Sequence, residues 1–301
     1  METWVFITVG AAFLQNIRSM LQKHLKGSMG NAAATFVRFG FGLPFALAFV
    51  ALLHLGAGYP IPAPNPEFAG WVILGGMAQI IATFLLLYIF GFRNFVVGTA
   101  YSRTEPAQAA LFGLLFLGER SAAGTLLAIA ISVVGVMFIS VARTGCGIRS
   151  LVSSLYSRTA LAGIASGTAF GIAAVAYRAA SLALGYPGFL MQAAVTLLAT
   201  ISFQTVLMLA WIGWRERSEF VRIRASWKIS AIVGMVGATA SFGWFAAMTL
   251  QQSAVVKALA QIEILFTIAT SILFFREKTN LLEFTGSALI IAGILSLLYV
   301  G

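Results

Sequence analysis

The stretch GTAYSRTEPAQAALFGLLFLGERSAAGTLLAIAISVVGVM at residues 98–137 returns, weakly but in register, as VKALAQIEILFTIATSILFFREKTNLLEFTGSALIIAGIL at residues 256–295. A constant offset of 158 residues places Glu105 on Glu263 and aligns a second pair of glutamates in the same way. Because the chain has only nine acidic residues, chance rarely aligns two of them with two others. We therefore interpret the chain as two copies of one structural unit.

The composition indicates a helical membrane protein. Hydrophobic residues make up 60% of the 301 residues and charged residues 9%, and the mean hydropathy is +0.94. A soluble domain carries about 25% charged residues, whereas a helix that spans a bilayer needs about 20 mostly apolar residues. The apolar runs are long and do not alternate with polar residues, which favours helices over the strands of a barrel. The predicted fold class is an all-α membrane protein.

The sequence carries little that indicates catalysis, metal binding or nucleic-acid binding. The net charge of +10 comes from bases in short connections between apolar runs, so membrane topology explains it better than nucleic acid does. The single cysteine, Cys146, excludes an intramolecular disulfide. His24 and His54 belong to no HExxH motif, and there is no Walker A sequence for ATP. We expect no catalytic residue, metal or cofactor, and a membrane enzyme is a weakly supported alternative.

Ten apolar segments are predicted to span the membrane, five in each copy. They run over about 3–22, 32–54, 68–90, 95–117, 123–141, 160–182, 187–213, 228–250, 254–275 and 281–300. The first segment contains Gln15, Asn16 and Arg18 and lacks a cleavage site, which favours a transmembrane helix over a signal peptide. Because five is odd, the second copy must enter the membrane in the opposite direction, so the ten helices form two inverted repeats. The predicted units are residues 1–145 and 159–301, joined by a linker at 146–158.

Basic residues predict which connections face the cytoplasm. They follow the odd-numbered segments, at Lys23, Lys26, Arg93, Arg143, Arg149, Arg158, Arg215, Arg217, Arg222, Arg224, Lys228, Arg276 and Lys278. The even-numbered connections contain essentially Arg120 alone. By the positive-inside rule the odd-numbered connections are cytoplasmic, and both termini lie on the non-cytoplasmic side. We expect the protein in a bacterial inner membrane.

Several short motifs stand in an order known from one transporter family. They are Lys23, Arg38-Phe39, Pro106 before Leu117-Gly118-Glu119-Arg120, Gly135, then Phe-Arg-Glu-Lys at 275–278 with Gly286 and Gly293. Over nearly the whole chain this pattern resembles the EamA-type, ten-helix members of the drug/metabolite transporter superfamily. The resemblance implies a carrier, commonly an exporter or exchanger of small metabolites, and names no substrate. Those members more often have cytoplasmic termini and a basic link after helix 2, whereas residues 56–64 contain no Lys or Arg. We keep the orientation that the charges of this chain predict.

Charged residues inside apolar segments are candidates for transport, because a charge at the bilayer centre costs about 2.5–3.5 kcal/mol. The candidates for substrate binding or coupling are Glu105, Glu263, Arg38, Arg103, Lys257 and Gln261, and Arg178 is a further intramembrane charge. In the fourth segment Pro106 removes the helical donor for the carbonyl of Ser102. The two glutamates could bind substrate or couple protons, or fixed bases such as Arg103, Lys257 or Arg38 could neutralise them. The sequence leaves both readings open.

The helical spacing gives the predicted cavity a basic character. Thr99 lies on one helix face with Arg103, and their counterparts Lys257 and Gln261 share a face in the second copy. Such faces favour an anionic or zwitterionic solute, bound near the midplane between segments 2, 4, 7 and 9. Further polar or aromatic residues could line a cavity or pack the bundle: Gln79, Tyr88, Tyr101, Gln108, Tyr177, Gln192 and Trp244.

We therefore expect a secondary active transporter, an exporter or exchanger, of a small polar metabolite such as an amino acid or organic anion. Its expected partners are this solute, the lipid bilayer, and a proton or counter-solute, with no nucleic acid. Broad drug efflux is one alternative, and a non-transporting scaffold or lipid-binding subunit is another. The protein is expected to be a monomer or homodimer. Gly163, Gly167 and Gly171 indicate close helix packing, within the bundle or at a dimer seam. Interface anchors are expected at Trp4, Trp71, Trp211, Trp214 and Trp227.

Overall fold

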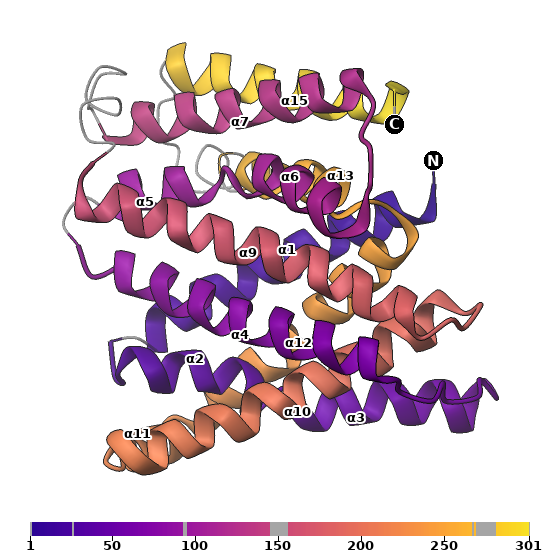
Figure 1. The fold of residues 1–301 in the computed structure, drawn as a ribbon. Helices are drawn as coiled ribbons and strands as arrows, with labels where there is room; N and C mark the ends of the chain where they lie inside the picture. Colours follow the sequence, from indigo (N-terminus) through magenta and orange to yellow (C-terminus); the bar gives the residue numbers. More distant parts are fainter. Residues whose placement is uncertain are drawn as a thin grey trace.

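Every regular element that the computed structural model describes is helical, and the described residues are 2–25, 27–92, 95–144, 156–266, 268 and 281–300. Figure 1 shows the helices gathered into one bundle. The elements of the first half are α1 (Thr3–Leu25), α2 (Asn31–Gly40), α3 (Leu43–Ala51), the π-helical turn η1 (Leu52–Gly56), α4 (Pro66–Ile89), α5 (Phe95–Ser102), α6 (Glu105–Leu117) and α7 (Ala123–Thr144). Those of the second half are α9 (Arg158–Ala183), α10 (Phe189–Arg215), α11 (Glu219–Ala225), α12 (Trp227–Leu250), α13 (Ser253–Leu259) and α15 (Leu281–Val300).

Within the described residues, 8 helical stretches are long and apolar enough to cross a membrane, in agreement with the predicted membrane class. They are α1, the stretch from α2 to η1, α4, α7, α9, α10, α12 and α15. Three predicted segments differ from a plain helix. The segment 32–54 is divided into α2, α3 and the turn η1. The segment 95–117 is divided into α5 and α6, and the segment 254–275 begins as the short helix α13 and is described only in part. The count of ten helices and the inverted repeat therefore stay predictions.

Several residues used for the sequence predictions lie outside the described part of the chain. They are Lys26, Arg93, Cys146, Arg149, Arg276, Glu277 and Lys278, together with most of the predicted linker. The bases of the seventh connection are described, and all are exposed at the end of the bundle around α11: Arg215, Arg217, Arg222, Arg224 and Lys228.

Local sequence explains where the central helices begin and end. Asn65 caps α4, because its side chain accepts a hydrogen bond from the backbone N–H of Phe68 at 2.7 Å, and Pro66 occupies the first turn. Gly118 ends α6 in the left-handed conformation, with φ of +66°. The backbone N–H of Glu119 then returns to the carbonyl of Gly113 at 3.1 Å. This turn fixes the position of the Glu119 side chain.

Three helix pairs have the most extensive contacts, namely α4 with α9, α7 with α15, and α1 with α12 (Figure 1). In terms of the predicted segments, these pairs join segments 3 and 6, 5 and 10, and 1 and 8. Exchanging the two copies converts the first pair into the third and leaves the second unchanged. The pattern of contacts is therefore the one that a two-fold relation between the copies predicts.

The contact between α7 and α15 has the same reciprocity at the level of single residues. A Cβ atom at Gly135 would lie 2.7 Å from the carbonyl oxygen of Gly286. A Cβ atom at Gly293 would lie 2.9 Å from the carbonyl oxygen of Ala128. The offset of 158 residues converts one contact into the other. Only glycine permits the two backbones to approach this closely.

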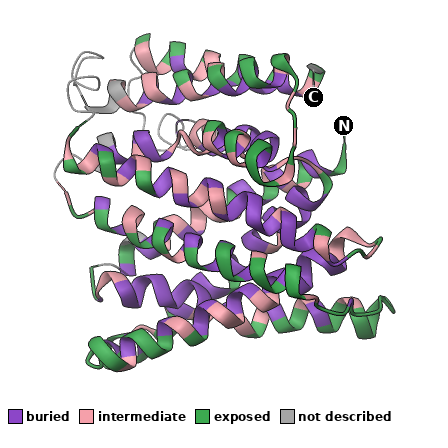
Figure 2. Cartoon of the chain, viewed as in Figure 1, coloured by how far each residue is buried: buried purple, intermediate pink, exposed green. Residues whose placement is uncertain are grey.

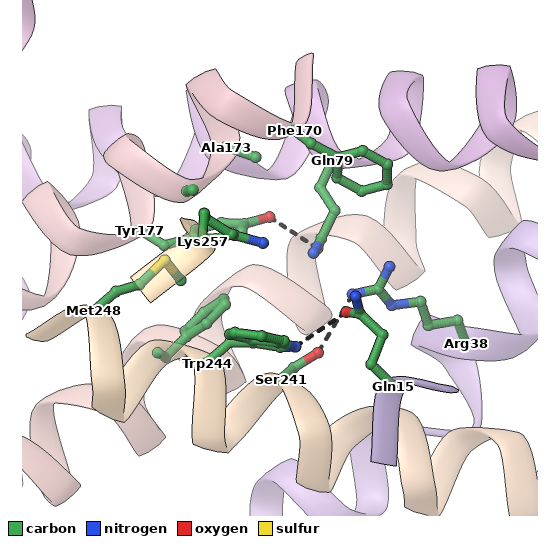
Figure 3. A pocket seen from close by; sticks show the side chains of 12 residues that line it. Gln15, Arg38, Gln79, Phe170, Ala173, Tyr177, Ser241, Trp244, Met248 and Lys257 are labelled. Carbon is green, nitrogen blue, oxygen red and sulfur yellow. Dashed lines mark hydrogen bonds between the residues drawn. The ribbon is translucent and has the colours of Figure 1, made fainter. Parts of the chain in front are cut away.

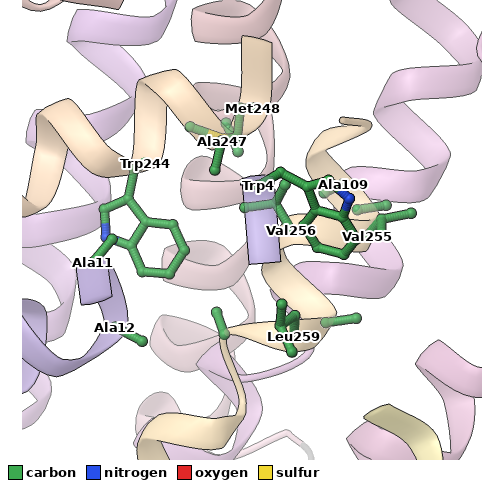
Figure 4. Close-up of a cluster of buried hydrophobic side chains, with 14 of the residues drawn as sticks. Trp4, Ala11, Ala12, Ala109, Trp244, Ala247, Met248, Val255, Val256 and Leu259 are labelled. Atoms are coloured by element: carbon green, nitrogen blue, oxygen red, sulfur yellow. The ribbon is translucent and has the colours of Figure 1, made fainter. Parts of the chain in front are cut away.

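Buried residues concentrate in the helices at the middle of the bundle, whereas α7 and α15 are exposed along their outer faces (Figure 2). A membrane would cover much of that apolar exterior. Trp4 differs from the prediction of an interface anchor, because it is 6% exposed. It packs in the central cluster with Met248, Val255 and Val256 (Figure 4). The indole packs against α12 and α13 inside the bundle and does not reach the membrane surface.

The glycines of α9 pack within the bundle. A Cβ atom at Gly163 would meet the carbonyl oxygen of Gly98 in α5, and one at Gly167 would lie 2.9 Å from the carbonyl oxygen of Ser102. At Gly171 the nearest atom is the backbone nitrogen of Ala109 in α6, at 3.2 Å. Of the two predicted roles, the structure therefore shows the intramolecular one. This packing brings α5 and α6, with the break between them, directly against α9.

Candidate functional site

Two helices are broken at equivalent places, within one residue of the 158-residue offset. The first break separates α5 from α6 at Arg103 and Thr104, and the second follows α13 at Ala260 and Gln261. In each break the backbone forms a tight turn, since Arg103 N donates to Ala100 O at 3.1 Å and Gln261 N donates to Ala258 O at 3.2 Å. Helical backbone resumes over 262–266. Discontinuous helices of this kind form substrate and ion sites in many transporters.

Only one of the two breaks has a cause in the local sequence. Pro106 lies in the first turn of α6 and cannot donate to the preceding helix, as the sequence predicts. The equivalent position in the second copy is Ile264, which has no such restriction. Tertiary contacts must therefore maintain the second break.

Two ion pairs cross between the broken helices. Lys257 Nζ lies 2.8 Å from Glu105 Oε1, and Arg103 Nη1 lies 3.2 Å from Glu263 Oε2. The base from each predicted copy thus pairs with the glutamate of the other predicted copy. The side chains of Lys257 and Glu105 are 13% and 18% exposed, and those of Arg103 and Glu263 are 33% and 7% exposed. Buried pairs of this kind are costly to break, because the remaining charge has no water to solvate it.

Polar side chains connect the ion pairs to the surrounding helices. Gln261 Nε2 donates to Arg103 O at 3.3 Å, so Gln261 supports the opposite break. Gln15 of α1 donates to Glu263 Oε2 at 3.4 Å and accepts from Trp244 Nε1 at 3.0 Å. The Lys257 ammonium also lies 4.8 Å from the centroid of the Trp244 ring. The charged groups are therefore held by α1 and α12 as well as by one another.

Two cavities meet at the crossed ion pairs. The larger, of about 110 Å³, is lined by Gln15, Arg18, Ser19, Leu86, Phe90, Thr99, Ser102, Arg103, Glu105, Phe170, Lys257 and Glu263. The smaller, of about 30 Å³, is lined by Gln15, Arg38, Gln79, Phe170, Ala173, Ala174, Tyr177, Ser241, Trp244, Phe245, Met248 and Lys257 (Figure 3). Gln15, Phe170 and Lys257 line both cavities.

The larger cavity extends towards one end of the bundle. It reaches Ser19 in the last part of α1 and Phe90 just after α4. α1 and α4 correspond to the predicted segments 1 and 3, so the connections that follow them there are odd-numbered. The smaller cavity lies on the other side of the ion pairs, next to the second halves of α9 and α12.

A cluster around Arg178 closes the end of the bundle beyond the smaller cavity. Arg178 Nε lies 2.5 Å from Glu119 Oε1, and Arg178 Nη1 donates to the carbonyl oxygens of Met248 at 2.5 Å and Gln251 at 2.8 Å. The guanidinium therefore caps the C-terminal end of α12 while it binds the connection after α6. We call these groups the Arg178 cluster. Ser121 adds a hydrogen bond to Gln252 at 2.9 Å.

Arg38 is placed beside the cavities as predicted, but without a carboxylate partner among the described residues. It is 4% exposed, and its guanidinium donates only to Thr83 Oγ1 and Ser241 Oγ, both at 3.4 Å. A second buried arginine, Arg18 in α1, lines the larger cavity and is 5% exposed. Sequence reasoning used Arg18 only as evidence against a signal peptide. A base inside the apolar segment 3–22 was the signal that could have identified it.

The structure thus brings together all six predicted site residues, in different roles. Four of them form the crossed ion pairs, Arg38 lines the smaller cavity, and Gln261 supports the break without lining either cavity. The prediction that segment 7 lines the site differs from the structure. Within the fully described helix α10 no residue lines either cavity, although Gln204 donates to Gln79 Oε1, whose side chain lines the smaller one. Segments 1, 3, 6 and 8 take its place.

Comparisons with known proteins show the family of this chain and a solved structure of similar fold. The family model described as "EamA-like transporter family" matches the chain twice, over residues 2–141 and 157–299. A solved structure titled "Crystal structure of protein" is similar over 100% of this chain and 99% of its own, with a TM-score of 0.70 and 17% sequence identity. At this identity the likeness shows a shared fold alone. The search of curated proteins finds no match.

Proposed function

Because the chain belongs to the EamA-like transporter family, we propose that it is a secondary active transporter that carries a small anionic or zwitterionic metabolite by alternating access. The observation that supports this most strongly is the crossing of two buried ion pairs between two broken helices at one cavity. A solute that enters the cavity meets charged groups contributed by both copies of the predicted inverted repeat. Its binding can therefore bias how the copies sit relative to each other.

The two ends of the site support alternating access. The larger cavity runs towards the odd-numbered connections, whereas the Arg178 cluster closes the opposite end. If the odd-numbered connections are cytoplasmic, as the basic residues predict, this arrangement corresponds to an inward-facing state. Opening to the other side requires Arg178 to leave Glu119 and the end of α12. Exchange, the solute's own gradient or protons supply the driving force, since the sequence has no Walker A motif.

The size and chemistry of the site favour a small metabolite over bulky drugs. The larger cavity measures about 110 Å³, whereas pockets for drug-sized ligands measure about 300–1,000 Å³. Four bases and two carboxylates line the two cavities, so their net positive charge favours an anionic group over a cationic one. The ion pairs fix where charged groups of a solute can be received.

Thiol accessibility tests alternating access without knowledge of the solute. The lone Cys146 is replaced by serine, and a cysteine is introduced at Ser19, which lines the larger cavity, or at Ala173, which lines the smaller one. A membrane-impermeant thiol reagent is then added to one side of the membrane at a time. We expect Ser19→Cys to react from the side of the odd-numbered connections, while Ala173→Cys stays protected.

The same experiment includes a variant that should shift the equilibrium. Arg178→Gln removes the charge that closes the far end, so Ala173→Cys should become reactive from the opposite side and Ser19→Cys should react more slowly. Reaction of both cysteines from the same side, before and after Arg178→Gln, would contradict alternating access. The Cys146→Ser protein without an added cysteine gives the background of the reagent.

A further inference from the structure

Two buried arginines lie side by side at the junction of the cavities. Arg18 comes from α1 and Arg38 from α2, and both side chains pass over Gly237 of α12. A Cβ atom at Gly237 would lie 3.3 Å from Arg18 Cδ and 3.6 Å from Arg38 Cγ. Because both stems contact the same glycine, the two positive charges lie near each other and repel. The packing of three helices holds them together in spite of that repulsion.

Neither arginine has a carboxylate within ion-pair distance among the described residues. Arg18 donates only a 3.4 Å hydrogen bond to Ser19 Oγ, and its Nε is buried without a partner. Arg38 reaches two hydroxyl groups at 3.4 Å. Glu263 acts on Arg18 only at longer range and already binds Arg103. Arg18 thus keeps a buried donor without an acceptor, and Arg38 has two long hydrogen bonds to neutral hydroxyl groups.

The charges that line the two cavities do not balance. Four bases line them, namely Arg18, Arg38, Arg103 and Lys257, against the two carboxylates Glu105 and Glu263. The crossed ion pairs neutralise two of the bases, so the excess of two positive charges belongs to Arg18 and Arg38. Buried charges without a partner are strongly unfavourable, and membrane proteins retain them mainly at functional sites. A ligand with two negative charges would restore the balance.

We propose that Arg18 and Arg38 together bind a dianionic group of the transported solute, a phosphate monoester or a dicarboxylate. This inference rests on the proposed transport function and narrows its solute class. The planar guanidinium fork donates two parallel hydrogen bonds to a carboxylate or phosphate, so two adjacent arginines suit a dianion better than a single carboxylate. Gln15, between the two cavities, and Ser241 offer further polar contacts.

Binding to the purified, full-length protein tests the proposal directly. The probes are glycerol 3-phosphate, malate, lactate and alanine, and the readouts are calorimetry and thermal stability in detergent. We expect glycerol 3-phosphate or malate to bind at least about tenfold more tightly than lactate or alanine, since the second negative charge adds charge-assisted hydrogen bonds to the guanidinium groups. The stronger of the first two distinguishes a phosphate from a dicarboxylate. Tighter binding of lactate or alanine would overturn the proposal.

Substitutions separate a binding role from a structural one. Arg18→Gln and Arg38→Gln should each weaken binding of the preferred dianion about tenfold or more. The same variants should leave the ligand-free protein as stable as the wild type or more stable, because each relieves the repulsion between the two charges. A structural role predicts the reverse: lower stability without ligand and unchanged binding. Arg224→Gln, on the exposed face of α11, is the matched control and should change neither property.

A third variant keeps both charges but disturbs their position. Gly237→Ala places a Cβ atom against both arginine stems, so dianion binding should weaken although the charge is unchanged. Unchanged binding in this variant and in both glutamine variants would refute the proposal. Transport of alanine without any dianion binding would refute this inference but leave the proposed function standing. Dianion binding without any flux would contradict the proposed function instead.

Discussion

The crossed ion pairs make a quantitative prediction about Lys257 and Glu105. Lys257→Met removes the ammonium and leaves the Glu105 carboxylate largely buried, at 18% exposure, without its partner. Glu105→Gln in turn leaves the buried Lys257 ammonium without its carboxylate partner. Each single change should therefore cost about 2 kcal/mol of folding free energy, less than the roughly 3–5 kcal/mol for a fully buried pair, because both side chains keep some exposure. The double variant carries no unpaired charge and should cost only about 1 kcal/mol, which a change in packing of this size explains.

The distances and burial of the two ion pairs determine how large each coupling free energy is and which pair has the larger one. At 2.8 Å and an effective dielectric constant of about 20, the attraction between Lys257 and Glu105 is about 6 kcal/mol before desolvation. Desolvation offsets much of this, so the measured coupling should be about 2–3 kcal/mol. The pair between Arg103 and Glu263 is longer, at 3.2 Å, and Arg103 is 33% exposed. Solvent screens it more, so its coupling should be smaller.

The assay is a double-mutant cycle for each pair, with unfolding free energies from denaturant titration in detergent micelles. For the second pair the variants are Arg103→Met and Glu263→Gln. A coupling below about 0.5 kcal/mol between Lys257 and Glu105 would refute the reasoning, since exposed pairs already reach that value. A larger coupling for Arg103 and Glu263 would refute the ranking by burial and distance.

Further predictions concern helix packing, a helix cap and the first break. Gly163→Ala should destabilise the protein by about 1–3 kcal/mol, because the new Cβ atom collides with the backbone of Gly98; Gly10→Ala, with nothing within 4 Å, is the matched control and should be neutral or stabilising in the same titration. Asn65→Ala should cost about 1–2 kcal/mol, because Asn65 caps α4 and also donates to the carbonyl of α9 at Ala183, at 2.6 Å. Pro106→Ala should preserve dianion binding in calorimetry, since the equivalent break persists without a proline; loss of binding would show that the proline alone sets the site.

The membrane class and the positions of the main helices could be predicted from the sequence, because apolar runs of about 20 residues have few alternatives. The segment 95–117 shows where this reasoning ends. Pro106 predicted a break in the hydrogen bonding of that helix, and the structure divides the segment just before Pro106 into α5 and α6. No residue near Ile264 predicts the break after α13. That break is supported by contacts with the other predicted copy, such as the hydrogen bond from Gln261 to Arg103 O.

The candidate site could be predicted as a set of residues but not as a network. The cost of intramembrane charge singles out Glu105, Glu263, Arg103 and Lys257 from the sequence alone. Which base meets which carboxylate depends on how the two copies pack, so the crossed pairing required coordinates. Arg18 was missed as a site residue, although a base inside the apolar segment 3–22 was visible in the sequence. Its importance comes from the approach to Arg38 over Gly237, and that approach joins three helices far apart in the sequence.

The central claim, that the protein transports a small anionic or zwitterionic solute, is tested most directly by exchange in proteoliposomes. Uptake of labelled glycerol 3-phosphate, malate, lactate and alanine is measured with and without the same unlabelled solute inside. We expect saturable uptake of at least one of them, accelerated by internal solute and abolished by Lys257→Met combined with Glu105→Gln. Uptake equal to that of empty liposomes for all four, with the protein folded, would contradict the account and favour a non-transporting membrane subunit.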